Sequence, residues 1–112
     1  MKYSDKQRIQ KIYDNAVKLN AYLKENNISK EMLLSSQPLQ WLVTTPLYNI
    51  GEHAYYLSDE YKNKHDKIQW KMIAGLRHRL VHDYDGINWN VIVDIVFNEI
   101  PELIEQIEKI EE

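Results

Sequence analysis

The sequence has no cysteine, few glycine and proline residues, and no long apolar run. Without cysteine it forms neither disulfide bonds nor thiolate zinc sites, which fits a reducing compartment. Three glycines and three prolines are too few for an all-β fold with many tight turns. Residues 1–6 contain no apolar signal core, and no stretch approaches the roughly 20 apolar residues that cross a bilayer. We therefore expect a soluble, cytoplasmic protein that does not associate with a membrane.

Net charge is also low, at −3 for the 112 residues at pH 7, but it is unevenly distributed. A negative total argues against general nucleic-acid binding, because affinity for phosphate is largely electrostatic. Residues 61–82, however, hold six of the fourteen Lys and Arg and one acid, whereas residues 98–112 hold six glutamates and one lysine. This polarity indicates either two solvated helix faces of opposite sign or a basic segment that binds an anion.

Apolar residues recur every three or four positions through most of the chain, and no segment alternates with period two. This spacing is typical of amphipathic helices, so the sequence predicts an all-α fold. A polar connection is expected over residues 61–67 and a turn over residues 85–88. The expected helices cover residues 5–25, 29–34, 39–61 and 89–110, and one more begins at residue 69 or 70 and ends between residues 82 and 84. Ser4, Ser29 and Asn88 are the expected helix caps, and bends are expected at Pro46 and Pro101.

Short connections between these segments favour an antiparallel, up-and-down bundle of four main helices plus short helical turns. The chain has no internal repeat, low-complexity tract or linker, so residues 1–112 are expected to form one domain. Trp41, Trp70 and Trp89 occupy periodic positions and are predicted to lie in the core.

Residues 75–84 combine a cation, an imidazole and a phenol with apolar positions. On a helix with about 100° per residue, Arg77 lies at the edge of the apolar stripe. His82 lies about 140° round from Arg77, facing solvent or another subunit, with His78 one turn before it. Because a half-buried cation needs an acceptor, we predict that Glu52 pairs with Arg77. One chain does not obviously bring these groups together, but a two-fold dimer with this helix at its seam would create a groove lined by both copies.

Arginine binds phosphate through a planar fork of donors, and histidine transfers protons near neutral pH, so these residues suggest phosphodiester chemistry with RNA as the substrate. Each residue also has a structural interpretation. Arg77 could serve only an ion pair at the core edge, His82 could be favoured by the helix dipole, and Tyr84 could cover the end of the core. His78 and His82 are spaced like a metal pair, but no third ligand is evident, so no metal or cofactor is predicted.

The spacing of Arg77, His82 and Tyr84 resembles the Arg-x4-His-x-Tyr signature of the HepT-like branch of HEPN domains. His78 stands where that branch often has Asn, at a position where HEPN domains accept Asn, Asp or His. Further segments resemble HepT-like proteins: residues 47–54 with an Ile-Gly-Glu sequence, residues 68–75 before the motif, and residues 100–107 in the last helix. The resemblance covers about residues 42–110.

The resemblance implies a helical bundle that forms a homodimer through the motif helix and cleaves RNA without a metal ion. It also implies a toxin paired with a cognate nucleotidyltransferase antitoxin of the MNT type, which would silence it by transferring AMP to Tyr84. In the expected mechanism, His82 moves the proton of the RNA 2′-hydroxyl, and Arg77 binds the phosphate as charge develops. His78, Arg79 and Glu52 are expected to support these groups or to position the RNA.

Two other functions stay open. One is a non-catalytic partner subunit of a small nucleotidyltransferase, in which Arg77 and His82 hold a nucleotide or substrate; the acidic net charge favours it, since a ribonuclease gains from a positive field. The other is a structural dimerisation bundle without a ligand. The intact motif favours the nuclease, because a scaffold needs no imidazole at that position.

Overall fold

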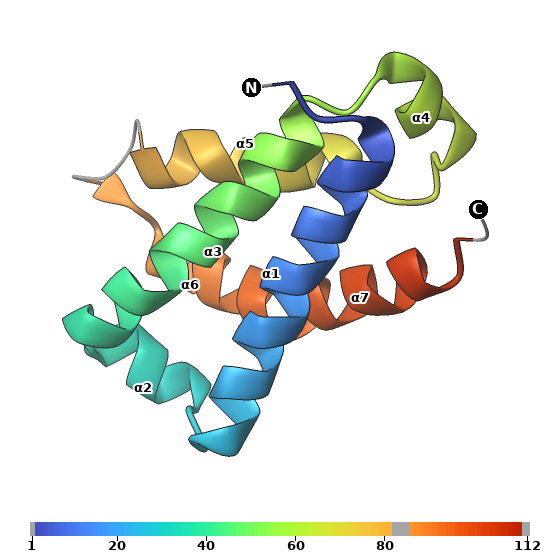
Figure 1. Cartoon of the computed structure of the whole chain (residues 1–112). Helices are drawn as coiled ribbons and strands as arrows, with labels where there is room; N and C mark the ends of the chain where they lie inside the picture. The colour runs from blue at the N-terminus through green and yellow to red at the C-terminus, as the bar shows by residue number, and fades with distance from the viewer. Residues whose placement is uncertain (1, 82–85, 111–112) are drawn as a thin grey trace.

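The computed structural model describes residues 2–81 and 86–110, and every regular element within them is a helix (Figure 1). This packed helical bundle confirms the predicted all-α fold. His82 and Tyr84, the expected end of their helix and the start of the expected turn at Asp85 lie outside the described residues. The elements are α1 (Asp5–Glu25), α2 (Lys30–Ser35), α3 (Gln37–Tyr55), α4 (Asp59–Lys64), α5 (Trp70–Val81), α6 (Trp89–Asp94), a π-helical stretch (Ile95–Glu99) and α7 (Ile100–Glu108).

Helix α1 has the bounds that its sequence predicts. The Ser4 side chain accepts a hydrogen bond from the Gln7 backbone, and the Gln7 side chain accepts one from the Ser4 backbone, which completes a capping box. Asn27, just after the helix, has a φ of 52°, a left-handed conformation that asparagine tolerates. One stripe of α1 is buried at the predicted spacing: Ile9, Ile12, Ala16, Leu19 and Leu23.

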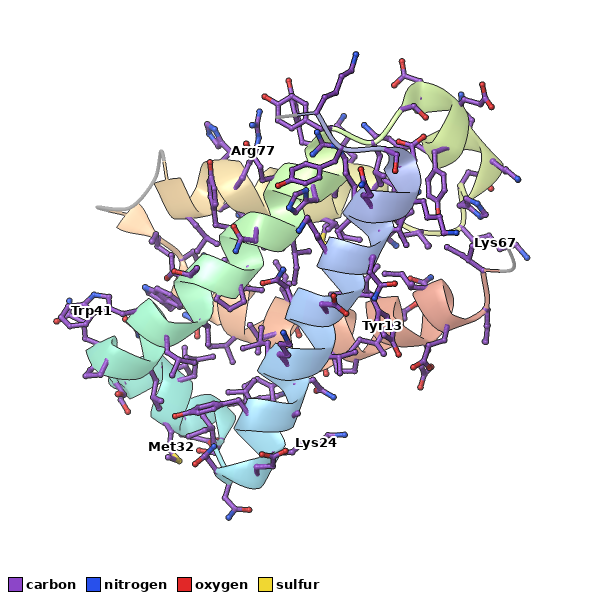
Figure 2. All side chains as sticks on the ribbon, viewed as in Figure 1. Tyr13, Lys24, Met32, Trp41, Lys67 and Arg77 are labelled. Atoms are coloured by element: carbon purple, nitrogen blue, oxygen red, sulfur yellow. The ribbon has the colours of Figure 1, made fainter. Side chains whose placement is uncertain are left out.

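The prediction that Trp41 lies in the core is wrong, since its side chain is 66% exposed and points away from the bundle (Figure 2). The buried stripe of α3 begins at Val43 and continues through Leu47, Ile50 and Ala54. At about 100° per residue, Trp41 lies roughly 160° round the helix from Val43, on the opposite face. Trp70 is buried as predicted, and Trp89 is half-buried against the core.

The helix predicted over residues 39–61 is too long at its carboxyl end. Helix α3 stops at Tyr55, and a separate helix, α4, begins at Asp59. The Ser58 side chain caps α4 by accepting from the Tyr61 backbone. Both the backbone and the hydroxyl of Ser58 donate to the Asp5 carboxylate, at 2.9 and 2.6 Å. The segment expected to be a polar connection is thus partly helical, and it is tied to the start of α1.

The last helical segment is continuous in space but changes its hydrogen-bonding pattern near the predicted bend. Asn88 caps α6 as expected, and the chain then widens into the π-helical stretch before α7. The Ile100 backbone donates to the Ile95 carbonyl, five residues back. Pro101 follows at the start of α7, where its missing N–H is tolerated. A π-helical insertion therefore lies directly before the proline at which the sequence predicts a bend.

Helices α1 and α3 lie side by side and run in opposite directions, with α5 and α7 crossing them (Figure 1). Helix α3 packs against α1 and α5, α1 also packs against α7, and α2 closes the end against α3 and α6. Within residues 2–81 and 86–110, each helix is too short or too polar to traverse a lipid bilayer. Leucine and isoleucine dominate the fully buried core: Ile12, Leu33, Leu47, Ile50, Leu76, Ile92, Ile100 and Leu103.

Candidate functional site

The contact between α3 and α5 is built around Gly51. A Cβ atom placed on Gly51 would lie 2.7 Å from the Arg77 backbone nitrogen and 3.2 Å from the Ile73 carbonyl oxygen. Only glycine lets the two backbones approach this closely. The Ile-Gly-Glu sequence therefore has a physical role, because the glycine brings α5 against α3 and places the next residue, Glu52, beside Arg77.

Arg77 and Glu52 form the predicted ion pair. Arg77 Nη1 donates to Glu52 Oε1 at 2.9 Å, and both side chains are about one-third exposed. Arg77 thus lies at the rim of the core, as its place on the helix predicts. The hydrogen bond to Glu52 raises the pKa of Arg77 above its ordinary value; Tyr56 adds to this effect, and burial opposes it. The guanidinium therefore stays positively charged throughout the physiological pH range.

Two tyrosines that the sequence analysis missed hold the Arg77 guanidinium. Its central carbon lies 3.6 Å from the centre of the Tyr55 ring and 5.7 Å from the centre of the Tyr56 ring. The face of an aromatic ring attracts a cation, so both tyrosines favour this position of the guanidinium. Their positions three and four residues after Glu52, on the same side of α3, were the available signal.

A hollow of about 750 Å³ runs along α5 next to Arg77. Its walls include the cations Lys62, Lys71, Arg77 and Arg79, together with the aromatic rings of Tyr55 and Trp70. Four of the six cations in the basic segment therefore line one concave surface. The hollow also includes His78 and Gly75, and a Cβ atom on Gly75 would meet no heavy atom within 4 Å.

The structure brings together most, but not all, of the residues predicted for the site. Arg77 and Glu52 are in contact, and His78 and Arg79 are exposed on the wall of the hollow. His82 and Tyr84 follow α5 in the chain but lie outside the described residues. Among the residues that are described, no group of three His, Asp or Glu side chains gathers at metal-binding distance.

Residues 8–110 match the family described as Ribonuclease HepT-like. The chain belongs to this HepT-like ribonuclease family, within the HEPN superfamily, as its motif predicts. The match covers nearly all of the described helices, including the Arg77–Glu52 contact.

Several proteins are similar to this HepT-like chain. The "Probable ribonuclease HepT" of Thermococcus cleftensis is 29% identical over 110 residues, 98% of each chain. A "Putative RNase" of Methanocaldococcus jannaschii is 38% identical over 85 residues, 76% of this chain and 70% of its own. Another "Putative RNase", of Caldanaerobacter subterraneus subsp. tengcongensis, is 44% identical over 61 residues; the match spans about half of each chain, 54% in both cases. No solved structure matches the chain.

Proposed function

We propose that this protein is a metal-independent endoribonuclease in which Arg77 and His82 act on the RNA backbone. The observation that carries the proposal is the placement of Arg77. It is held by Glu52 and Tyr55 at the wall of a hollow that also exposes Lys71 and Arg79, in a chain of the HepT-like ribonuclease family. A concave surface with several cations concentrates phosphate even on a protein whose net charge is negative.

In the proposed reaction, His82 removes the proton of an RNA 2′-hydroxyl. The 2′ oxygen attacks the adjacent phosphorus and forms a pentacoordinate phosphorane. The bond to the 5′ oxygen then breaks, and that oxygen accepts a proton, which leaves a 2′,3′-cyclic phosphate and a 5′-hydroxyl end. Arg77 stabilises the charge that develops on the phosphate oxygens. Its guanidinium has five N–H donors, and Glu52 Oε1 accepts from one of the two on Nη1, so donors are left for phosphate.

The proposed cleft lies between two copies of the chain related by a two-fold axis. The open space at Gly75 supports this arrangement, because it lets a second backbone or an RNA strand approach α5 closely. His82 follows the end of α5, so a seam along this helix would bring the motifs of both copies to one groove. His78 and Arg79 on the wall of the hollow would position the RNA.

The proposal extends to regulation. We propose that the nuclease is a toxin and that a cognate MNT-type nucleotidyltransferase is its antitoxin. In this scheme the antitoxin transfers AMP to the Tyr84 hydroxyl. The added nucleotide would block the groove by its volume and by repulsion between its phosphate and that of RNA.

A non-catalytic subunit that binds a nucleotide for a nucleotidyltransferase is the second candidate. The hollow along α5 favours it, because the exposed Tyr55 ring and four cations would hold the base and phosphates of a single nucleotide. This function needs Arg77 but not the imidazole of His82, so the two candidates make different predictions for the His82→Ala variant.

The test is an RNA digest with the full-length chain in excess EDTA. We expect the wild type to cut and to leave cyclic phosphate ends. His82→Ala should lower the rate by about 10²–10⁴-fold and Arg77→Ala by about 10²–10³-fold. The matched control is Lys24→Ala, which removes a cation at the far end of α1 and should leave the rate unchanged (Figure 2).

Equal cutting by His82→Ala and the wild type would contradict the proposal, and loss of cutting in EDTA would contradict its metal independence. If the wild type does not cut but binds a nucleotide, and Arg77→Ala abolishes that binding, the subunit function replaces the nuclease.

A further inference from the structure

A second group of cations and aromatic rings lies beyond the Arg77–Glu52 pair, where the start of α1 meets the end of α3. The central carbon of the Arg8 guanidinium lies 5.3 Å from the centre of the Tyr3 ring and 5.2 Å from the centre of the Tyr56 ring. The Lys11 amine lies 5.0 Å from the Tyr3 ring centre. The Arg8 Nη1 atom also lies 3.2 Å from His53 Nδ1. These five residues are called the α1–α3 cluster below.

The α1–α3 cluster is continuous with the proposed active site. Tyr56 contacts both arginines, since its ring centre lies 5.2 Å from Arg8 and 5.7 Å from Arg77. A hollow of about 320 Å³ lies over the cluster, with Glu52, the partner of Arg77, in its wall beside Arg8 and His53. A strand whose phosphate lies at Arg77 could therefore extend past Tyr56 onto Arg8.

Glu52 lies in the wall of this hollow, but its carboxylate forms its ion pair with Arg77. Within the described part of the chain, no carboxylate lies at ion-pair distance from Arg8 or Lys11. Burial and these two cations lower the pKa of His53, against the opposing effect of Glu52. His53 is therefore neutral at pH 7, and its Nδ1 accepts from Arg8 and holds that side chain in place.

The exposed rings indicate what kind of anion fits. Tyr56 is 52% exposed although it lies between two guanidinium groups. An unpaired base stacks on such a ring or on an arginine plane, whereas paired bases are stacked already and do not need it. Phosphate-binding cations beside an exposed ring are the combination that single-stranded nucleic acid uses.

We propose that the α1–α3 cluster binds the nucleotide that flanks the scissile phosphate in a single-stranded RNA substrate. Arg8 and Lys11 contact the flanking phosphate, and the flanking base stacks on Tyr56. This subsite rests on the proposed ribonuclease function, which it deepens by assigning the strandedness of the substrate and residues outside the motif. Arg8, Lys11 and Tyr56 are positioning residues, because they do not touch the reacting atoms.

The test measures binding, so that it does not depend on cleavage. A fluorescent single-stranded RNA of eight nucleotides with 2′-O-methyl groups cannot be cut, and its anisotropy reports binding to the full-length chain. We compare Arg8→Ala, Tyr56→Leu and Tyr56→Phe with Lys24→Ala, which removes a cation from the same helix at its other end. Each variant is titrated at several salt concentrations, both with this single strand and with a duplex of the same length.

Arg8→Ala should weaken binding and lower the slope of log K against log salt by about 0.7, the value for one phosphate contact on a single strand. Tyr56→Leu should weaken binding about tenfold without changing that slope, because stacking is not electrostatic. Tyr56→Phe keeps the ring and should bind like the wild type. Lys24→Ala should change neither quantity.

Two results would overturn the subsite. Unchanged binding by Arg8→Ala would show that RNA does not reach the cluster, and the cluster would then fit an acidic protein segment instead. A loss that is equal for single-stranded and duplex RNA, with no effect of Tyr56→Leu, would show a phosphate patch without base stacking. The proposed ribonuclease function is judged separately: a wild type that cuts RNA in EDTA keeps that function even if the subsite fails, and Arg8-dependent binding without cutting keeps the subsite alone.

Discussion

The two ends of α3 both expose aromatic residues, but the surroundings of these residues differ. At the amino end, Trp41 is 66% exposed and Leu42 beside it is also exposed. At the carboxyl end, Tyr55 and Tyr56 are about half exposed, and guanidinium groups lie within 6 Å of both rings. An exposed aromatic residue is therefore informative only together with its neighbours. Cations, a hollow and a close helix contact together make the carboxyl end of α3 a candidate site.

The largest difference should appear when one tryptophan is removed near each end of α3. Trp70, the first residue of α5, lines the same hollow as Tyr55 at the carboxyl end, and Trp41 lies at the amino end. Trp70 is 5% exposed, and its indole Nε1 donates to the His65 carbonyl oxygen at 3.0 Å. Trp70→Ala should therefore lower the free energy of unfolding by about 3–5 kcal/mol. Trp41→Ser should change it by less than about 0.5 kcal/mol, because Trp41 contributes little buried surface. Urea unfolding followed by circular dichroism measures both. A large loss for Trp41→Ser would contradict the comparison.

The two helical glycines, Gly51 in α3 and Gly75 in α5, should respond in opposite ways to substitution by alanine. Gly51→Ala forces a Cβ atom to within 2.7 Å of the Arg77 backbone nitrogen and should cost about 1–3 kcal/mol of stability. Within one copy of the chain, Gly75→Ala meets open space and should stabilise the fold by about 0.5–1 kcal/mol, since alanine is the better helix former. Thermal or urea unfolding of the two variants provides the measurement. Equal effects would mean that α3 and α5 are not held together by the close contact at Gly51.

The smallest expected effect concerns pH. Burial, Arg8 and Lys11 lower the pKa of His53 in the folded protein below its ordinary value of 6.5. The unfolded chain therefore binds this proton more readily, so stability is complete above about pH 6.5 and falls as the pH drops through the interval down to the lowered pKa. His53→Asn should flatten this acid slope. The urea midpoints of the wild type and the variant at several pH values measure this slope. An unchanged slope would show that His53 does not cause the loss of stability in acid.

The sequence predicts those features that depend on local pattern. The bounds of α1 follow from Ser4 and an uninterrupted spacing of three and four residues. The Arg77–Glu52 pair follows because a cation at the edge of an apolar stripe needs an acceptor on the neighbouring helix. The first feature has its cause within one helix, and the second follows from the need of one half-buried charge for a partner.

Features that depend on packing between distant segments are harder to predict. Tyr55, Tyr56 and Leu57 continue the apolar pattern of α3, which hid the cap at Ser58 and led to the wrong end of that helix. The contact of Arg8 with Tyr56 joins residues 48 positions apart, and no spacing rule connects them. The contact between Arg77 and Glu52 was therefore predicted, whereas the rings that surround it were missed.

The proposed reaction depends on attack by the RNA 2′-hydroxyl, with Arg77 and His82 acting on one phosphate. The most direct test is digestion, in EDTA, of an oligonucleotide that the wild type cuts at one position. A single 2′-deoxy substitution on the 5′ side of that phosphate removes the nucleophile and leaves every other contact in place. We expect cutting at this position to stop, whereas a deoxy substitution one nucleotide further along should leave cutting there unchanged. Continued cutting at the substituted position would contradict attack by the 2′-hydroxyl.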